Sequence, residues 1–301
     1  MAANGLRRTS LYASGASPVN MLQAQFYNAD CLVYDLEDSV PPEGKDAARF
    51  LVYNILLHHR PAEKHIVVRV NPLGTIYFDE DIEAIVRARP DAIRLPKVES
   101  ANDVRMASEK IEAVERKAGI EPGAIKLWCN LESYLGVLRA EEIATASPRI
   151  IALALSAEDF TASMRSARTK PGWEIFHARN LVLMASRKAG VDAQDAVFAD
   201  INDMEGLRED MEMSKTLGFD GKTVIHPRQI DIVNSYFTPS KKEINYALRV
   251  FDAIDEARSQ NKGAVALDGN MIDEPIVVRA RTVLAMARAA GIRVEGDYYD
   301  R

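Results

Sequence analysis

Residues 31–38, CLVYDLED, join a short apolar run to three acidic residues at its carboxyl end. A run of this length, rich in apolar and β-branched residues, is typical of a strand that is buried on both faces. Similar runs recur along the chain, between longer segments whose apolar residues have helical spacing. The sequence therefore predicts eight strands, at 9–13, 31–36, 66–71, 92–96, 125–131, 150–155, 196–200 and 222–226.

This alternation of strands and helices determines the fold class that we expect. It indicates a parallel sheet, and eight units indicate closure into a TIM (β/α)8 barrel of the α/β class. Gly119, Gly190 and Gly218 each follow a helical segment, as glycines that end helices do. An open doubly wound sheet is the alternative, but no GxGxxG or P-loop motif supports it. We expect the barrel at 1–238 and a C-terminal helical arm or lid at 239–301, unless the latter only caps the bottom of the barrel.

The composition argues against several classes of protein. Of the 301 residues 27% are charged, and the formal net charge of -6 provides no basic field for nucleic acid or an anionic membrane. The longest apolar run, 150–155, is far shorter than the ~20 residues of a membrane span, and no secretory signal is evident. Cys31 and Cys129 lie in apolar runs, and we expect both to be buried and unpaired. The sequence thus predicts a cytoplasmic protein with no nucleic-acid or membrane partner.

Polar residues stand at the carboxyl ends of the predicted strands, where the active sites of TIM barrels are built. These residues are Asp35, Glu37, Arg69, Lys97, Glu132, Asp159, Asp200 and His226. Each residue type has a structural alternative. A carboxylate can cap a helix, an arginine can form an ion pair, a lysine can be a solvated charge, and a histidine can end a strand. Because the strand ends of a barrel meet at one rim, we nevertheless expect these side chains to converge.

The carboxylates at this rim indicate a metal site. Several carboxylates in one cleft repel one another unless a cation lies among them. Oxygen ligands without a Cys/His cluster favour Mg²⁺, which takes one or two carboxylates and keeps several waters. We predict that Glu132 and Asp159, on neighbouring strands, are the ligands. Mg²⁺ can then act as a Lewis acid on a 2-hydroxyacid group, while an arginine stabilises the enolate left when the adjacent carbon–carbon bond breaks.

Eight motifs resemble the citrate lyase beta subunit (citryl-ACP lyase) family, of the HpcH/HpaI aldolase superfamily, in order and spacing. They are DLEDSV (35–40), VRVNP (68–72), RLPK (94–97), LES (131–133), SAEDF (156–160), GFDGK (218–222), PRQI (227–230) and DGNMID (268–273). The superfamily also includes malyl-CoA and citramalyl-CoA lyases. The resemblance covers nearly the whole chain and implies a TIM barrel that binds Mg²⁺.

The resemblance also implies roles for individual residues. Glu132 and Asp159 would hold the metal, and Arg69 would contact the oxyanion on the thioester side. Asp35 and Glu37 would be outer partners of metal-bound water. The catalytic set is then Arg69, Asp273, Asp35 and Glu37, and the substrate-binding set is Arg69, Lys97 and Glu132. A Schiff-base aldolase built on Lys97 is an alternative that requires a desolvated lysine.

Asp273 lies outside the predicted barrel, just before a helix that begins near Pro275. The resemblance implies that Asp273 reaches the site of a neighbouring subunit, where it would be the acid that protonates the enolate carbon. Its structural alternative is the N-cap of that helix. Two departures from the family pattern bear on the substrate: Ser156 stands where glycine is usual, and residues 13–15 replace a Phe/Val-Pro-Gly run.

The expected reaction is cleavage of a citryl thioester to oxaloacetate and an acetyl thioester. The alternatives are a stand-alone citramalyl-CoA or malyl-CoA lyase and a non-catalytic subunit that docks a carrier protein. His226 resembles the CoA-thioester branch, whereas RTK (168–170) and EIFHAR (174–179) resemble the citryl branch. The implied partners are an acyl-carrier-protein or CoA thioester, the alpha and gamma subunits of citrate lyase, and further copies of this chain in a homotrimer or hexamer.

Overall fold

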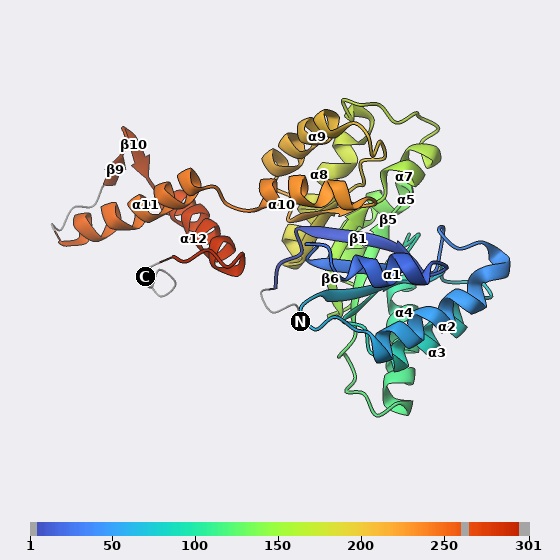
Figure 1. Cartoon of the computed structure of the whole chain (residues 1–301). Coiled ribbons are helices and arrows are strands. Elements are labelled where there is room, and N and C mark those ends of the chain that lie inside the picture. Colours follow the sequence, from blue (N-terminus) through green and yellow to red (C-terminus); the bar gives the residue numbers. More distant parts are fainter. Residues whose placement is uncertain (1–4, 260–264, 295–301) are drawn as a thin grey trace. The chain divides into compact units, whose positions relative to one another are not determined.

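The computed structural model describes residues 5–259 and 265–294. Its first compact unit, made mainly of Arg7–Asn234, is a closed barrel of eight parallel strands (Figure 1). The strands pair in sequence order, and β8 closes the barrel by pairing with β1. The predicted TIM barrel is confirmed, and the open doubly wound sheet is wrong. The strands are β1 Thr9–Ser14, β2 Cys31–Asp35, β3 His65–Arg69, β4 Ala92–Leu95, β5 Lys126–Leu131, β6 Ile150–Leu155, β7 Asp192–Asp195 and β8 Gly221–Val224.

Helices connect successive strands and surround the barrel (Figure 1). Gly190 and Gly218 cap the ends of two of them with left-handed φ angles of 68° and 102°, which a glycine adopts without steric strain. The helices of this unit are α1 Pro18–Ala24, α2 Lys45–His58, α3 Phe78–Arg87, α4 Ala101–Lys117, α5 Tyr134–Leu138, α6 Ala140–Ala144, α7 Ala157–Ser163, α8 Trp173–Ala189, α9 Met204–Leu217 and, at its end, α10 Ile230–Phe237. Two 3₁₀ turns, Pro42–Gly44 and Pro227–Gln229, complete the connections.

Buried apolar side chains pack the strands together. Strands β2, β3 and β4 are buried along their whole length, as expected for a parallel sheet that is covered on both faces. Both cysteines are buried and free, as predicted. One core cluster comprises Cys31, Val33, Val67, Ala92, Trp128 and Ala152. This packing fixes the strand ends that carry the polar residues.

The seventh strand is not where the sequence pattern predicted it. The prediction of 196–200 is wrong, because β7 spans Asp192–Asp195 and the apolar segment after it forms no ladder. Asp200 and Asn202 therefore do not end a strand. They lie in an exposed turn, where the Asn202 amide donates to a carboxylate oxygen of Asp200 at 3.0 Å.

A buried ion cluster explains why a polar sequence forms this strand. Asp195 accepts two hydrogen bonds of 2.9 Å from Arg179 and one of 3.0 Å from Lys222. Asp210 of α9 lies 2.5 Å from Arg179 and 2.6 Å from Lys222. Both cations therefore meet two carboxylates, which satisfies the charges that burial would otherwise destabilise. Asp195 makes β7 polar in sequence, but its partners Arg179 and Lys222 come from α8 and β8.

The second compact unit, made mainly of Ser235–Arg301, contains α11 Lys241–Ser259, the hairpin strands β9 Val265–Leu267 and β10 Asn270–Ile272, and α12 Glu274–Ala289. Asp268 and Gly269 form the turn that joins β9 to β10, and their positive φ angles of 51° and 81° fit this tight hairpin. The two short strands were not predicted. The role of 239–301 as an arm or lid stays a prediction.

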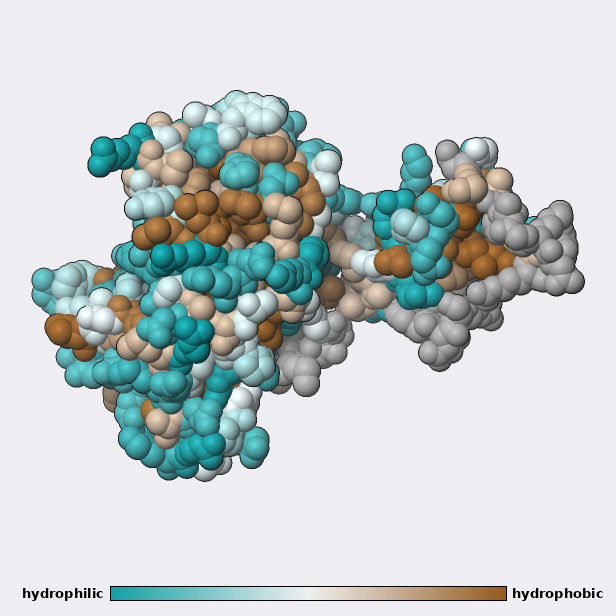
Figure 2. All heavy atoms as spheres, turned by 180° about the vertical axis from the view of Figure 1, so that it is seen from behind, coloured by the Kyte–Doolittle hydropathy of each residue, from teal (hydrophilic) through white to brown (hydrophobic). Residues whose placement is uncertain are grey.

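The surface of the described chain is mixed in character. In Figure 2 hydrophilic side chains cover much of the visible face, with smaller apolar areas between them. Within the described residues, no helix is both long enough and apolar enough to cross a membrane.

Closure of the barrel yields a stability prediction at Gly221, the first residue of β8. A Cβ atom here would lie 2.0 Å from the backbone oxygen of Arg7, a contact that requires the backbone to move. Gly221→Ala should therefore lower the free energy of unfolding by about 3 kcal/mol. Urea unfolding followed by circular dichroism measures this change.

Gly44→Ala is the matched control. There a Cβ atom would lie 3.5 Å from the Pro41 ring, which is an ordinary contact, so stability should change by no more than about 0.5 kcal/mol. Equal unfolding midpoints for the two variants would contradict the tight approach of β8 to the segment before β1.

Candidate active site

A cavity of about 880 Å³ lies at the carboxyl ends of the barrel strands. Four of the predicted site residues line it: Asp35, Arg69, Asp159 and His226. Three others contact or act electrostatically on these residues without lining the cavity: Glu37, Lys97 and Glu132. The convergence expected from the sequence is thus present for these residues, whereas Asp200 lies apart in its exposed turn.

Arg69 and Asp35 form the central ion pair of the site. They end neighbouring strands, and their Cα atoms are register partners. Arg69 donates from Nε and Nη2 to the two Asp35 oxygens at 2.6 and 2.8 Å, which is a bidentate geometry. Backbone amides of Glu37 and Ser39 also donate to Asp35, both at 3.0 Å. Burial acts to raise the pKa of Asp35, but the hydrogen bonds and charge of Arg69 hold it below its usual value.

Glu37 bridges this pair to Lys97. Its carboxylate lies 3.0 Å from Arg69 Nη1 and accepts a hydrogen bond of 2.8 Å from Lys97 Nζ. Although burial acts to lower the pKa of Lys97, the Glu37 carboxylate raises it above its ordinary value. A Schiff-base lysine needs a lowered pKa, so the ion pair between Lys97 and Glu37 disfavours the aldolase alternative.

Glu132, directly after β5, is buried and only partly satisfied. One oxygen accepts a hydrogen bond of 2.8 Å from the Asn130 amide, but the buried Oε2 has no hydrogen-bond partner among the described residues. Burial, followed by the negative charges of Glu37 and Asp159, raises the pKa of Glu132 to about 7. Asp159 lies in the first turn of α7, and Ser156 Oγ donates to it at 2.9 Å.

These features fit a divalent cation. A divalent cation would pair with the unpartnered oxygen of Glu132. It would also offset the repulsion from Glu37 and Asp159 that opposes the ionisation of Glu132. Among the described residues, no group of three or more His, Cys, Asp and Glu side chains is arranged to hold a metal. Glu132 and Asp159 would thus supply only two protein ligands, which leaves coordination positions for water and substrate, as Mg²⁺ prefers.

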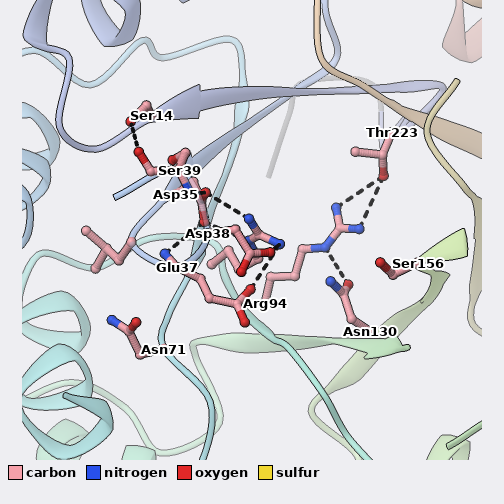
Figure 3. A network of polar contacts seen from close by, with 12 residues as sticks. Ser14, Asp35, Glu37, Asp38, Ser39, Asn71, Arg94, Asn130, Ser156 and Thr223 are labelled. Carbon is pink, nitrogen blue, oxygen red and sulfur yellow. Dashed lines mark hydrogen bonds and ion pairs between the residues drawn. The ribbon is translucent and has the colours of Figure 1, made fainter. Parts of the chain in front are cut away.

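Arg94 lines the cavity, although the sequence pattern had predicted no site role for this residue of the RLPK motif. Its guanidinium is buried and donates to Asn130 Oδ1 at 2.6 Å and to Thr223 Oγ1 at 3.2 and 3.3 Å (Figure 3). It also lies over the rings of Tyr12 and Trp128, 5.2 and 5.6 Å from their centroids. The available signal in the sequence was its position in the predicted strand that follows the one with Arg69; in the structure the two residues are register partners, and such residues face the same side.

Two remaining candidates have clear local roles. His226 lines the cavity, and its Nδ1 accepts from the Arg228 amide at 3.2 Å, which caps a 3₁₀ turn. Asp273 belongs to the second unit and is the N-cap of α12, where it accepts from the Ile276 amide at 3.2 Å. The predicted N-cap is confirmed, and a catalytic role for Asp273 stays a prediction.

One family model and several known proteins resemble this chain over most of its length. The model described as HpcH/HpaI aldolase/citrate lyase matches residues 8–227. A citrate lyase subunit beta from Leuconostoc mesenteroides subsp. cremoris is 42% identical over 297 residues, 98% of each chain. A (3S)-malyl-CoA thioesterase from Cereibacter sphaeroides is 34% identical over 94% of this chain and 95% of that protein. The crystal structure of protein CitE from Mycobacterium tuberculosis, in complex with magnesium, acetoacetate and coenzyme A, has a TM-score of 0.75 at 30% identity, covering 95% of this chain and 99% of that one.

The raised pKa of Glu132 yields a prediction for the metal-free protein. The folded pKa of about 7 exceeds the ordinary carboxyl value, so Glu132 favours folding at low pH, and this contribution is lost as the pH rises through 7. Glu132→Gln, which stays neutral, should match the wild type near pH 4.5 and be more stable by roughly 3 kcal/mol at pH 8. Urea unfolding in a chelator over this range measures the difference, and parallel pH profiles would contradict it.

Proposed function

Since this chain belongs to the HpcH/HpaI aldolase/citrate lyase family and is a lyase, we propose that it splits a citryl thioester into oxaloacetate and an acetyl thioester. The observation that carries the proposal is that two buried arginines and Asp159 line one cavity, while the partly unsatisfied carboxylate of Glu132 is hydrogen-bonded to Asn130 of the same lining. Glu132 and Asp159 suit the metal-bound end of a 2-hydroxyacid, and Arg69 and Arg94 suit its anionic groups. Identity of 42% over nearly the whole length to a citrate lyase subunit beta supports this substrate over others of the family.

The proposed reaction breaks one carbon–carbon bond. The substrate hydroxyl loses its proton, its oxygen becomes the ketone of oxaloacetate, and the electron pair of the broken bond passes to the acetyl thioester as an enolate. A proton then reaches the enolate carbon, so no oxidant or reductant is needed. Mg²⁺ held by Glu132 and Asp159 would polarise the hydroxyl and the neighbouring carboxylate of the substrate.

Arg69 is proposed to stabilise the enolate oxygen. Its guanidinium is oriented by the two hydrogen bonds to Asp35, so it need not reorganise as charge develops. Glu37 contacts both Arg69 and Lys97 and would position these cations beside the substrate. Asp35 and Glu37 would thus act through Arg69 and Lys97, and the role expected for them as outer partners of metal-bound water stays a prediction. Asp273 as the acid that protonates the enolate carbon, supplied by a neighbouring copy, remains part of the proposal.

The carrier and the assembly are also proposals. The mycobacterial CitE structure contains coenzyme A, which favours a phosphopantetheine thioester, as found in CoA and in acyl carrier proteins. The identity to a citrate lyase subunit beta favours alpha and gamma subunits as partners. A homotrimer or hexamer would allow Asp273 to act between copies.

Product analysis tests the function. The purified protein with Mg²⁺ should release oxaloacetate from a citryl thioester faster than pyruvate from citramalyl-CoA or glyoxylate from malyl-CoA. Release of free thiol without an oxoacid would indicate thioester hydrolysis, the activity named for the Cereibacter relative. No turnover and no Mg²⁺ binding would favour the docking subunit.

The metal assignment gives a separate prediction. Glu132→Gln and Asp159→Asn should each weaken Mg²⁺ binding by at least about 100-fold and abolish turnover, because each removes a charged ligand from a two-carboxylate site. Calorimetric Mg²⁺ titration measures the affinity, and circular dichroism confirms the fold. Glu112→Gln is the matched control, because Glu112 is a partly exposed carboxylate of α4 that pairs with Arg116 at 2.6 Å and does not line the cavity. Wild-type affinity in either ligand variant would refute the assignment.

A further inference from the structure

Arg94 is a buried cation without a carboxylate partner. Only 2% of the residue is exposed, yet among the described residues no carboxylate oxygen lies within 4.0 Å of its guanidinium. Arg69, by contrast, is paired with Asp35 and Glu37. A buried guanidinium that meets only neutral acceptors is costly to desolvate, unless an anion enters the site and pairs with it.

The structure holds Arg94 in place and leaves it hydrogen-bonding capacity. Its Nε is committed to Asn130, and Nη1 and Nη2 share one oxygen of Thr223 at 3.3 and 3.2 Å. A guanidinium carries five N–H groups, so at least two remain for another acceptor. Because Arg94 and Thr223 both line the cavity, an anion in the cavity can reach this donor pair.

Asn130 connects Arg94 to the carboxylate pair. Its Oδ1 accepts from Arg94 at 2.6 Å (Figure 3). Its Nδ2 donates to Glu132 at 2.8 Å. Arg94 is therefore one amide group away from Glu132. An acyl group whose 2-hydroxyacid portion lies beside Glu132 would place a further short substituent near Arg94.

We infer that Arg94 binds the second carboxylate of the acyl group and so selects a citryl thioester over citramalyl and malyl thioesters. This inference rests on the proposed function and specifies its substrate. A citryl group carries a carboxymethyl substituent on the hydroxyl-bearing carbon, where citramalyl carries a methyl group and malyl a hydrogen. Only the citryl carboxylate supplies the charge that Arg94 lacks. A substrate without it leaves the buried guanidinium unpaired, which is the basis of strong discrimination.

The test compares Arg94→Met with wild type on citryl and citramalyl thioesters. The substitution should lower kcat/KM for the citryl substrate by about 100-fold or more and change that for the citramalyl substrate by less than about 10-fold. Binding of oxaloacetate and pyruvate in the presence of Mg²⁺, measured by calorimetry, is the second readout. The variant should lose affinity for oxaloacetate and retain affinity for pyruvate.

Two further variants separate this role from a general loss of structure. Arg94→Lys keeps the charge but not the fork of donors, so it should recover part of the preference for the citryl substrate. Arg116→Met removes an exposed arginine of α4 that pairs, among the residues described by the structure, with surface carboxylate Glu112 alone, and it should behave as wild type.

The outcomes distinguish the inference from the proposed function. If the wild type prefers the citryl thioester and folded Arg94 variants keep its substrate ratio and its oxaloacetate affinity, the role of Arg94 is refuted and the function stands. If the wild type cleaves the citramalyl or malyl thioester faster than the citryl thioester, both are refuted.

Discussion

The bidentate ion pair between Arg69 and Asp35 is the contact around which the candidate site is organised. It joins the ends of β3 and β2 through two hydrogen bonds, at a rim where several carboxylates are buried. Buried charges require partners, and a bidentate arginine supplies one in a fixed geometry. Glu37 extends the network from Arg69 to Lys97, so these four groups largely satisfy one another.

Two other buried charged groups of the candidate site, Glu132 and Arg94, have no oppositely charged partner of this kind among the described residues. Glu132 has a buried oxygen without a hydrogen-bond partner among the described groups, and Arg94 meets only neutral acceptors. Asn130 lies between them, accepting from one and donating to the other. The amide keeps the opposite charges apart, so each could pair with a ligand: the proposed divalent cation at Glu132 and the proposed anion at Arg94. A substrate with both a chelating hydroxyacid and a second carboxylate complements this arrangement.

The ion cluster of Arg179, Asp195, Lys222 and Asp210 has a different character. Its members come from α8, β7, β8 and α9, and every cation meets two carboxylates. This cluster is internally balanced, and it attaches two helices to the last strands of the barrel. The buried charges of this cluster are fully paired and stabilise the fold, whereas the incompletely paired Glu132 and Arg94 are the groups proposed to bind ligands.

Much of the fold could be read from the sequence, because a buried parallel strand between amphipathic helices leaves a local apolar pattern. That pattern located seven of the eight barrel strands and the rim residues Asp35, Arg69, Glu132 and Asp159. It failed at β7, where the buried Asp195 is neutralised by cations that are distant in sequence. It also left Arg94 unassigned, because an isolated arginine on a strand does not reveal whether a carboxylate faces it. Local spacing is encoded in the sequence, whereas the partner of a buried charge depends on which strands and helices meet after the barrel closes.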